Sequence, residues 1–276
     1  MKRRILVKLL FTDLDGTLLN NASQVAPDTK AFLDEFLDAG NKLILSSGRP
    51  MYSVLEVKEN AGLTQSGIFL ICNNGTLVYD CDKNCNIMEK RLPMPYISYL
   101  QQQASHYGVH IQTYTEDAIV SPADDEEITY YRRKIHLPLI ISPNLSDALT
   151  VDPYKMLAIS LHDPQKLEAF RQGISEWAKG RIQTIYSSNV YLELIVHTAG
   201  KGNAVRFLCD HLQVPLSDAY AAGDADNDIS MLEAAGTGIA MANAADNVKQ
   251  VANVITDLDN DRDGLADKMR KLLGWK

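Results

Sequence analysis

Two aspartates, Asp13 and Asp15, directly follow an apolar run from Ile5 to Phe11. The run is typical of a buried strand, which Gly16 and Thr17 then end. Because alternate residues of an extended strand point to the same side, we expect both carboxylates to converge at the carboxyl end of this strand. Two close carboxylates repel each other, and a bound Mg²⁺ or a raised pKa on one of them would offset the repulsion. Taken alone, the pattern also fits an acidic turn that ends a strand.

A second acidic cluster, Gly223-Asp224-Ala225-Asp226-Asn227-Asp228, follows a short apolar segment. Acidic residues are ordinary at a helix N-terminus, so each aspartate alone fits an N-cap. Four acidic or amide residues among positions 224–228 exceed what a cap requires. The cluster therefore predicts a cation site if the chain brings it close to Asp13.

Three other positions have the chemistry to bind a phosphate. Ser47 and Gly48 end a second apolar strand, and a hydroxyl together with the backbone N–H groups of such a turn binds phosphate oxygens. Asn74 follows a third strand at the same expected sheet edge. Lys201 opens a helix, where a cation is unfavourable unless it faces an anion. The alternatives are a helix cap for Ser47, a strand-ending turn for Asn74 and a solvated side chain for Lys201.

The string Phe11-Thr12-Asp13-Leu14-Asp15-Gly16-Thr17-Leu18-Leu19 closely resembles the first motif of the haloacid dehalogenase superfamily. The resemblance implies that Asp13 is a nucleophile that attacks phosphorus and that Asp15 is the general acid and base. P-type ATPases in this superfamily carry Thr at the second position and keep a long-lived aspartyl phosphate. An Asp at position 15 can activate water against that intermediate, so the chain resembles a phosphatase rather than a pump.

The later segments resemble the remaining motifs of the superfamily in the right order. Ser47 and Gly48 are similar to the second motif, Lys201-Gly202 to the third and residues 223–228 to the fourth. The resemblance implies that Asp224 binds Mg²⁺ directly, with Asp13 and Asp15, while Asp228 supports the metal. It also implies that Lys201 neutralises phosphate and orients Asp13.

Two asparagines complete the resemblance. Asn74, in Asn73-Asn74-Gly75, resembles an Asn-Gly of the Cof-type subfamily and would line the site, and Asn227 would contact phosphate or hold its loop. The insertion after the second motif indicates a class-II (C2B-like) cap.

The elements that must position these residues alternate along the chain. Apolar runs at 42–46 and 68–72 predict buried strands, separated by helical patterns such as 28–39. This rhythm predicts an α/β fold with a Rossmann-like parallel sheet and helices on both faces. It breaks off after Gly75 and resumes near residue 201. We therefore expect a catalytic core of residues 1–83 and 197–276, interrupted by an inserted α+β cap domain at 84–196.

The bulk properties exclude several classes. A net charge of −8 over 276 residues argues against non-specific nucleic-acid binding. No apolar run has the roughly 20 residues of a membrane span. The basic residues 2–4 mimic a signal peptide, but Lys8 interrupts the apolar run and no small-residue cleavage site precedes Asp13. We expect a cytoplasmic protein whose four cysteines are reduced.

One acidic stretch imitates a calcium site. Residues Asp259, Asp261 and Asp263 begin like an EF-hand loop, but the twelfth position is Arg270, where a bidentate Glu is required. We expect no calcium site there.

The sequence thus predicts a Mg²⁺-dependent phosphomonoester hydrolase that acts on a small phosphorylated metabolite, above all a sugar phosphate, through an aspartyl phosphate. A sugar phosphomutase and a non-catalytic protein that binds a phosphate ligand remain alternatives. The oligomeric state is not encoded in any recognisable pattern.

Overall fold

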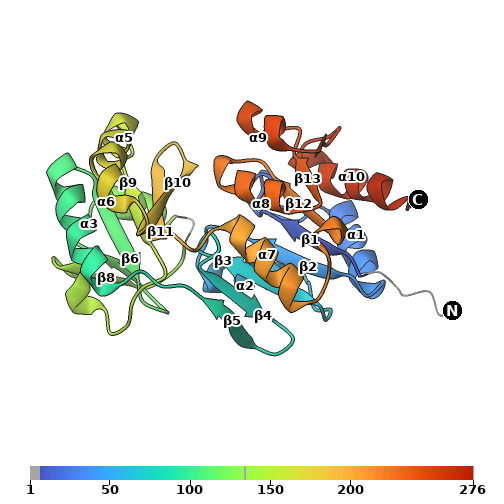
Figure 1. The fold of residues 1–276 in the computed structure, drawn as a ribbon, viewed down its shortest axis with the longest axis horizontal. Helices are drawn as coiled ribbons and strands as arrows, with labels where there is room; N and C mark the ends of the chain where they lie inside the picture. Colours follow the sequence, from blue (N-terminus) through green and yellow to red (C-terminus); the bar gives the residue numbers. More distant parts are fainter. Residues whose placement is uncertain (1–6, 134, 276) are drawn as a thin grey trace. The chain divides into compact units, whose positions relative to one another are not determined.

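The computed structural model describes residues 7–133 and 135–275, which form two compact units (Figure 1). One unit comprises Met1–Met88 and Gly200–Lys276, and the other comprises Glu89–Ala199. Residues 2–4, Ile5 and Leu6 lie outside the described residues. The first described strand begins at Leu9.

The first unit is built on an eight-stranded sheet with the order β14-β13-β12-β1-β2-β3-β4-β5. The strands from β14 to β3 run parallel, and β4 pairs antiparallel with β3. The strands are β1 (Leu9–Thr12), β2 (Lys42–Ser46), β3 (Ile68–Cys72), β4 (Leu77–Asp80), β5 (Cys85–Glu89), β12 (Ala219–Gly223), β13 (Thr237–Ala240) and β14 (Val254–Ile255). This arrangement confirms the predicted α/β class with a mostly parallel sheet.

Helices connect the parallel strands of this unit. They are α1 (Pro27–Asp38), α2 (Met51–Asn60), α7 (Lys201–His211), α8 (Ile229–Ala234), α9 (Asp246–Val251) and α10 (Gly264–Leu273), with short 3₁₀ helices at Leu216–Asp218, Asp226–Asp228 and Asn260–Arg262. Helix α1 buries Phe32, Leu33, Phe36 and Leu37, which the 3.6-residue period places on one face. It packs against α10, while α7 packs against α8.

The central strands are buried along their whole length. All residues of β1 and β3 are buried, as expected for strands covered by helices on both faces. Strand β1 lies between β12 and β2, with Thr12 in register with Ala222 on one side and Leu45 on the other. The loops that follow β1, β2, β3 and β12 therefore meet at one edge of the sheet.

The second unit is built on a six-stranded sheet with the order β10-β11-β9-β6-β7-β8, antiparallel except for the β7–β8 pair. Its strands are β6 (His110–Tyr114), β7 (Ile119–Ser121), β8 (Leu139–Ile141), β9 (Met156–Ile159), β10 (Ile182–Ser188) and β11 (Tyr191–Val196). Its helices are α3 (Met94–Tyr107), α4 (Glu126–Tyr131), α5 (Pro164–Gly173) and α6 (Ser175–Ala178), with a 3₁₀ helix at Leu145–Ala148.

Alternate residues of the second sheet belong to two separate hydrophobic clusters. Met156 and Ala158 of β9 join a cluster with residues of α3 and α5, whereas Leu157 and Ile159 join one with residues of α4. This alternation is the two-residue period of a strand covered on both faces.

The chain crosses from the first unit to the second after Met88 and returns at Gly200. Residues 84–88 were expected in the insertion but belong to the first unit, because β5 pairs with β4 there. Residues 197–199 were expected in the core but belong to the second unit. Within the described part of the chain, no helix combines the length and the apolarity needed to cross a membrane.

Candidate active site

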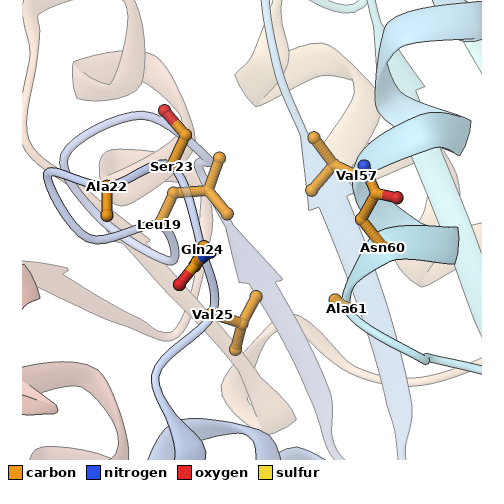
Figure 2. Close-up of a pocket in the computed structure, with 8 residues that line it drawn as sticks. All are labelled: Leu19, Ala22, Ser23, Gln24, Val25, Val57, Asn60 and Ala61. Atoms are coloured by element: carbon orange, nitrogen blue, oxygen red, sulfur yellow. The ribbon is translucent and has the colours of Figure 1, made fainter.

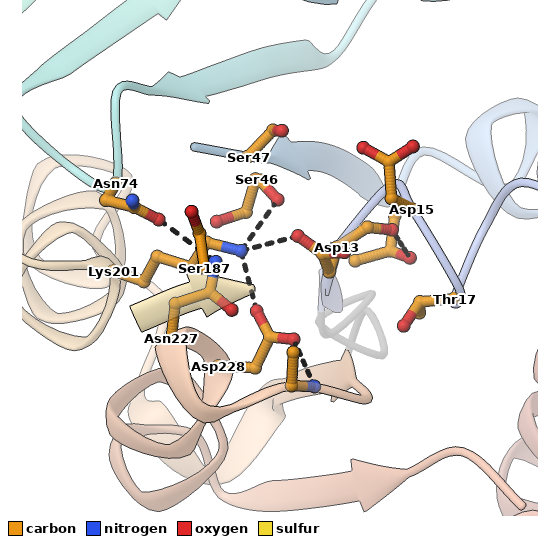
Figure 3. A network of polar contacts seen from close by, with 12 residues as sticks. Asp13, Asp15, Thr17, Ser46, Ser47, Asn74, Ser187, Lys201, Asn227 and Asp228 are labelled. Atoms are coloured by element: carbon orange, nitrogen blue, oxygen red, sulfur yellow. Dashed lines mark hydrogen bonds and ion pairs between the residues drawn. The ribbon is translucent and has the colours of Figure 1, made fainter. Parts of the chain in front are cut away.

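The side chain of Lys201 joins two aspartates at the carboxyl edge of the first sheet (Figure 3). Its Nζ lies 2.5 Å from Oδ1 of Asp13 and 2.6 Å from Oδ1 of Asp228, and it donates to the backbone carbonyl of Ser46 at 3.2 Å. Asp13 follows β1, Lys201 opens α7 and Asp228 ends a 3₁₀ helix after β12. Segments about two hundred positions apart in the chain thus contribute to one cluster.

Asp228 also shapes the loop that carries Asp224. Its Oδ2 accepts hydrogen bonds from the backbone N–H groups of Asp224 at 3.0 Å and Ala225 at 3.1 Å. Asp228 is fully buried. Its two oxygens therefore have different partners, because one faces Lys201 and the other holds the loop.

The cluster carries more negative than positive charge. Carboxylate oxygens of Asp13, Asp224 and Asp228 lie within 4.8 Å of one another. Burial, and then the charges of Asp228 and Asp224, raise the pKa of Asp13 well above its usual range, although Lys201 opposes this. Burial and the charge of Asp228 raise the pKa of Asp224 to about 6. Burial alone would lower the pKa of Lys201, but Asp13 and Asp228 outweigh it and raise that pKa.

These carboxylates fit a hard divalent cation. One ammonium group opposes three carboxylates, so a cation of charge two would balance the cluster. Gly16, at φ +82°, leaves room for the Asp224 carboxylate, because a Cβ there would lie 2.4 Å from its Oδ2. The donors are oxygens alone, which is the set that Mg²⁺ prefers in proteins.

Asp15 does not join this cluster. Strand β1 ends at Thr12, so the backbone at 13–15 is not the extended strand on which the expected convergence rested. The Asp15 side chain is 52% exposed and pairs with Arg49, while Asp13 is buried against Lys201. The two carboxylates thus have separate partners.

The residues expected to bind phosphate lie in neighbouring loops of this edge. The N–H of Asn74 donates to the carbonyl of Ser47 at 3.0 Å, and Asn227 donates to Asn74 Oδ1 at 3.1 Å. A Cβ at Gly48 would lie 3.0 Å from Asn74 Nδ2. Ser47, Gly48, Asn74 and Asn227 are thereby brought together.

Two buried polar atoms in these loops have no partner among the described residues. They are Ser46 Oγ and Asn74 Nδ2. A buried donor without a partner is costly, so the Asn74 amide is suited to a ligand oxygen.

Three residues of the site were not assigned roles by sequence reasoning. Thr17 donates from its hydroxyl to Asp224 Oδ1 at 2.8 Å. Ser46 accepts from Lys201 through its backbone, and Arg49 pairs with Asp15. Thr17 stands inside the first motif, and Arg49 directly follows Ser47 and Gly48 of the second. A hydroxyl and a cation in or next to the motifs were therefore the available signals. Ser46 makes its contact through its backbone carbonyl, and such a contact cannot be predicted from the type of side chain.

A separate cavity of ≈ 470 Å³ lies between the loop 19–25 and the end of α2 (Figure 2). Its lining residues are Leu19, Ala22, Ser23, Gln24, Val25, Val57, Asn60 and Ala61. None of these side chains is acidic or basic, and Ser23 has no acidic or basic residue beside it in this lining to activate its hydroxyl. This cavity is therefore distinct from the acidic cluster and carries no catalytic set.

A family model described as haloacid dehalogenase-like hydrolase matches residues 10–269. The chain belongs to the haloacid dehalogenase-like hydrolases. This confirms the resemblance read from the motifs, and the relatives named as phosphatases identify the protein as a phosphatase of this family, of the Cof type.

Similar proteins cover nearly the whole of this haloacid dehalogenase-like hydrolase. The phosphatase YwpJ of Bacillus subtilis is 30% identical, with 97% of this chain and 100% of that protein covered. YwtE of the same organism, a 5-amino-6-(5-phospho-D-ribitylamino)uracil phosphatase, is 28% identical, with 97% and 98% covered. A crystal structure of a haloacid dehalogenase-like hydrolase from Bacteroides thetaiotaomicron has a TM-score of 0.86 at 27% identity, with 96% and 99% covered.

Proposed function

We propose that the protein is a cytoplasmic, Mg²⁺-dependent phosphomonoesterase that acts on sugar phosphates through an aspartyl phosphate on Asp13. The observation that carries the proposal is the buried contact of Lys201 with Asp13 beside the carboxylates of Asp224 and Asp228. A nucleophilic carboxylate must approach an anionic phosphate, and that approach is possible only where positive charge screens both.

The metal would be held by the carboxylates of Asp13 and Asp224 and by the backbone carbonyl of Asp15, with Asp228 supporting it through water or hydrogen bonds. When bound, Mg²⁺ supplies positive charge that neutralises Asp13 and the phosphoryl oxygens. The raised pKa values of Asp13 and Asp224 support this role, since they express the repulsion that a cation would relieve.

The phosphoryl group would be bound by the loops after β2 and β3. The hydroxyl of Ser47 and the backbone N–H at Gly48 donate to its oxygens, as does the Nδ2 of Asn74. Asn227 fixes the Asn74 side chain through the 3.1 Å contact to Oδ1. The ammonium of Lys201 neutralises another phosphoryl oxygen while it orients Asp13.

The reaction has two steps. A carboxylate oxygen of Asp13 attacks phosphorus, the bond to the leaving oxygen breaks, and Asp15 donates a proton to that oxygen. Water then attacks the phosphorus of the aspartyl phosphate, the bond between phosphorus and the Asp13 oxygen breaks, and Asp15 takes a proton from the attacking water. Inorganic phosphate leaves, and both Asp13 and Asp15 return to their starting states.

The leaving group would be a sugar or sugar-like alcohol. The name of the relative YwtE describes a phosphorylated ribityl group, a polyol chain whose chemistry is close to that of a sugar phosphate. The core binds the phosphoryl group common to all such substrates. We therefore assign the choice among alcohols to the inserted domain, Glu89–Ala199.

The test is hydrolysis of a panel of sugar and polyol phosphates with and without Mg²⁺. Asp13→Ala should lower kcat by at least about 1,000-fold because the nucleophile is lost. Asp226→Ala is the control, since Asp226 is exposed in the same loop as Asp224 and its carboxylate accepts from Asn247. Substantial turnover by Asp13→Ala, or none by the wild type on any phosphomonoester, would contradict the proposal.

A second measurement tests the covalent step. Asp15→Asn should accumulate an enzyme form heavier by one phosphoryl group, because water is no longer activated. Mass spectrometry after acid quenching of the reaction would detect it. A variant that turns over slowly and never carries phosphate would rule out the aspartyl phosphate.

A further inference from the structure

Arg49 grips the carboxylate of Asp15 with two parallel hydrogen bonds. Its Nε lies 2.9 Å from Oδ2 and its Nη2 lies 2.6 Å from Oδ1. A planar guanidinium that meets both oxygens of a carboxylate fixes the plane of that group as well as its position. Neither step of the proposed reaction assigns a role to Arg49.

The backbone of Arg49 is tied to the loops expected to bind phosphate. Its N–H donates to Ser47 Oγ at 3.1 Å, and its carbonyl accepts from the N–H of Asn73 at 3.0 Å. The guanidinium also donates from Nη1 to Ser53 Oγ at 3.4 Å. The orientation of Asp15 is therefore set from the loops after β2 and β3, although Asp15 itself follows β1.

Stability does not account for this pair. The side chain of Asp15 is 52% exposed, and exposed ion pairs contribute little to folding. Without the guanidinium, an exposed aspartate samples several staggered rotamers. Proton transfer requires the carboxyl group within hydrogen-bond reach of the leaving oxygen, so its orientation has a direct effect on rate.

We propose that Arg49 is the positioning residue for Asp15, an inference that rests on the proposed function of Asp15 as general acid and base. Arg49 holds the carboxyl group at the place from which it serves the leaving oxygen and, later, the attacking water. It acts through Asp15 and not by binding the phosphoryl group.

The experiment compares two substrates whose leaving groups differ. Arg49→Gln should lower kcat at least about tenfold for an alkyl phosphate such as glycerol phosphate, because the alkoxide must be protonated as it leaves. The loss in the first step should be smaller for 4-nitrophenyl phosphate, whose leaving group departs without a proton, as measured from the nitrophenolate burst. KM and the inhibition constant of inorganic phosphate should change less than about threefold.

A double-mutant cycle tests whether the effect passes through Asp15. In an Asp15→Asn background, Arg49→Gln should have no further effect on the burst or on steady-state turnover, since the carboxylate that Arg49 positions is already lost. Arg49→Lys should resemble Arg49→Gln, because an ammonium keeps the charge but lacks the planar fork.

The chain offers a matched control in the same unit. Arg262 makes an equivalent fork with Asp259, at 3.0 Å from Nε to Oδ1 and 2.9 Å from Nη2 to Oδ2. Arg262→Gln removes that fork and should leave kcat and KM for both substrates unchanged.

Several outcomes would overturn the role of Arg49. They are an unchanged kcat for glycerol phosphate, equal losses for the two substrates with a raised phosphate inhibition constant, or full additivity with Asp15→Asn. The last two would mean that Arg49 binds the phosphoryl group. Turnover by Asp13→Ala would instead end the proposed function itself, so the two failures are distinguishable.

Discussion

At the scale of single residues, the site depends on which charges are buried together. Lys201 is 1% exposed and its Asp13 and Asp228 partners are 9% and 0% exposed. A buried ammonium is tolerated because two carboxylates contact it, and only the loss of both would leave its charge uncompensated. The same burial keeps water away from Asp13, which strengthens every electrostatic contact made there.

Gly16 provides the sharpest single-residue prediction. Gly16→Ala should displace the Asp224 carboxylate, because the new Cβ would lie 2.4 Å from its Oδ2. We expect kcat to fall at least about tenfold and the Mg²⁺ concentration for half activity to rise, since a ligand is misplaced. Steady-state kinetics over a Mg²⁺ titration would measure both.

Gly40 is the matched control for the backbone strain that Gly16→Ala introduces at a positive φ. It has φ +85°, close to the +82° of Gly16, but a Cβ there meets nothing within 4 Å. Gly40→Ala should cost about 1–2 kcal/mol of stability from backbone strain and leave kcat intact. Wild-type kinetics in Gly16→Ala would show that the Asp224 carboxylate does not need its present place.

At the scale of elements, the second sheet contains a buried ion pair of its own. Lys155 Nζ lies 2.8 Å from Glu193 Oε2, and the two side chains are 1% and 5% exposed. Glu193 also accepts from Ser187 Oγ at 3.2 Å, and the ammonium lies 5.1 Å from the ring centroid of Tyr114. Strands β10, β11 and β6 and the residue that precedes β9 are thereby joined through side chains.

Glu193→Ala should lower the free energy of unfolding by about 3 kcal/mol or more, because it removes the counter-charge of a buried lysine. Thermal and urea unfolding would measure the change. Glu176→Ala is the control, since Glu176 pairs with Lys179 on the surface, where both side chains are largely exposed, and should cost less than about 1 kcal/mol. Equal costs for the two variants would contradict the argument.

Elements with one simple pattern were predictable from the sequence. The continuous apolar runs 42–46 and 68–72 correspond to β2 and β3 residue for residue, because strands buried on both faces need no alternation. Strand β10, which is mostly half-buried and reads Ile-Gln-Thr-Ile-Tyr-Ser-Ser, offers no such pattern and was not recognised. The acidic cluster enters not a single helix but a 3₁₀ turn, Asp226–Asp228, followed by α8.

The candidate site was predictable where a family motif assigned a role to a residue. Lys201 and Asp228 were named from their motifs, and the structure brings both to Asp13. The place of Asp15 was not, because it depends on where β1 ends and on Arg49, which stands 34 positions away. Pairings of this kind arise from tertiary packing, which local patterns do not encode.

At the scale of the whole molecule, a metal ion bound at the acidic cluster would contribute to stability. Asp13 follows the central strand β1, and Asp224 follows its neighbour β12. A cation shared by these residues binds the folded chain and not the unfolded one. Ligation therefore stabilises the fold of the first unit as a whole.

We expect Mg²⁺ at about 100 times its dissociation constant to stabilise the protein by about 2.7 kcal/mol at neutral pH. The increase should shrink as pH falls through about 6, where Asp224 takes up a proton and ceases to be a ligand. Differential scanning calorimetry with Mg²⁺ or EDTA, at about pH 7.5 and about pH 5, would test this.

In the metal-free protein, the contribution of Asp224 to stability should change with pH in the opposite direction. The pKa of Asp224 is raised from 3.8 to about 6 in the folded state, so between these values the folded chain binds a proton that the unfolded chain does not. That contribution favours folding as pH falls through this range and disfavours it above. Asp224→Asn should weaken both trends without removing them, because burial and Asp228 raise the pKa of Asp13 as well. A Mg²⁺ effect of equal size at the two pH values would count against the site.

The order of β1 in its sheet has a consequence for synthesis on the ribosome. Strand β1 lies between β2 and β12, and β12 comes from the last quarter of the chain. A nascent chain that ends before residue 201 thus contains Asp13 without the lysine and the aspartates that surround it in the folded protein. The intervening sheet has all its strands within Glu89–Ala199 and is fully translated earlier. Catalytic competence is therefore the last property that a growing polypeptide of this design acquires.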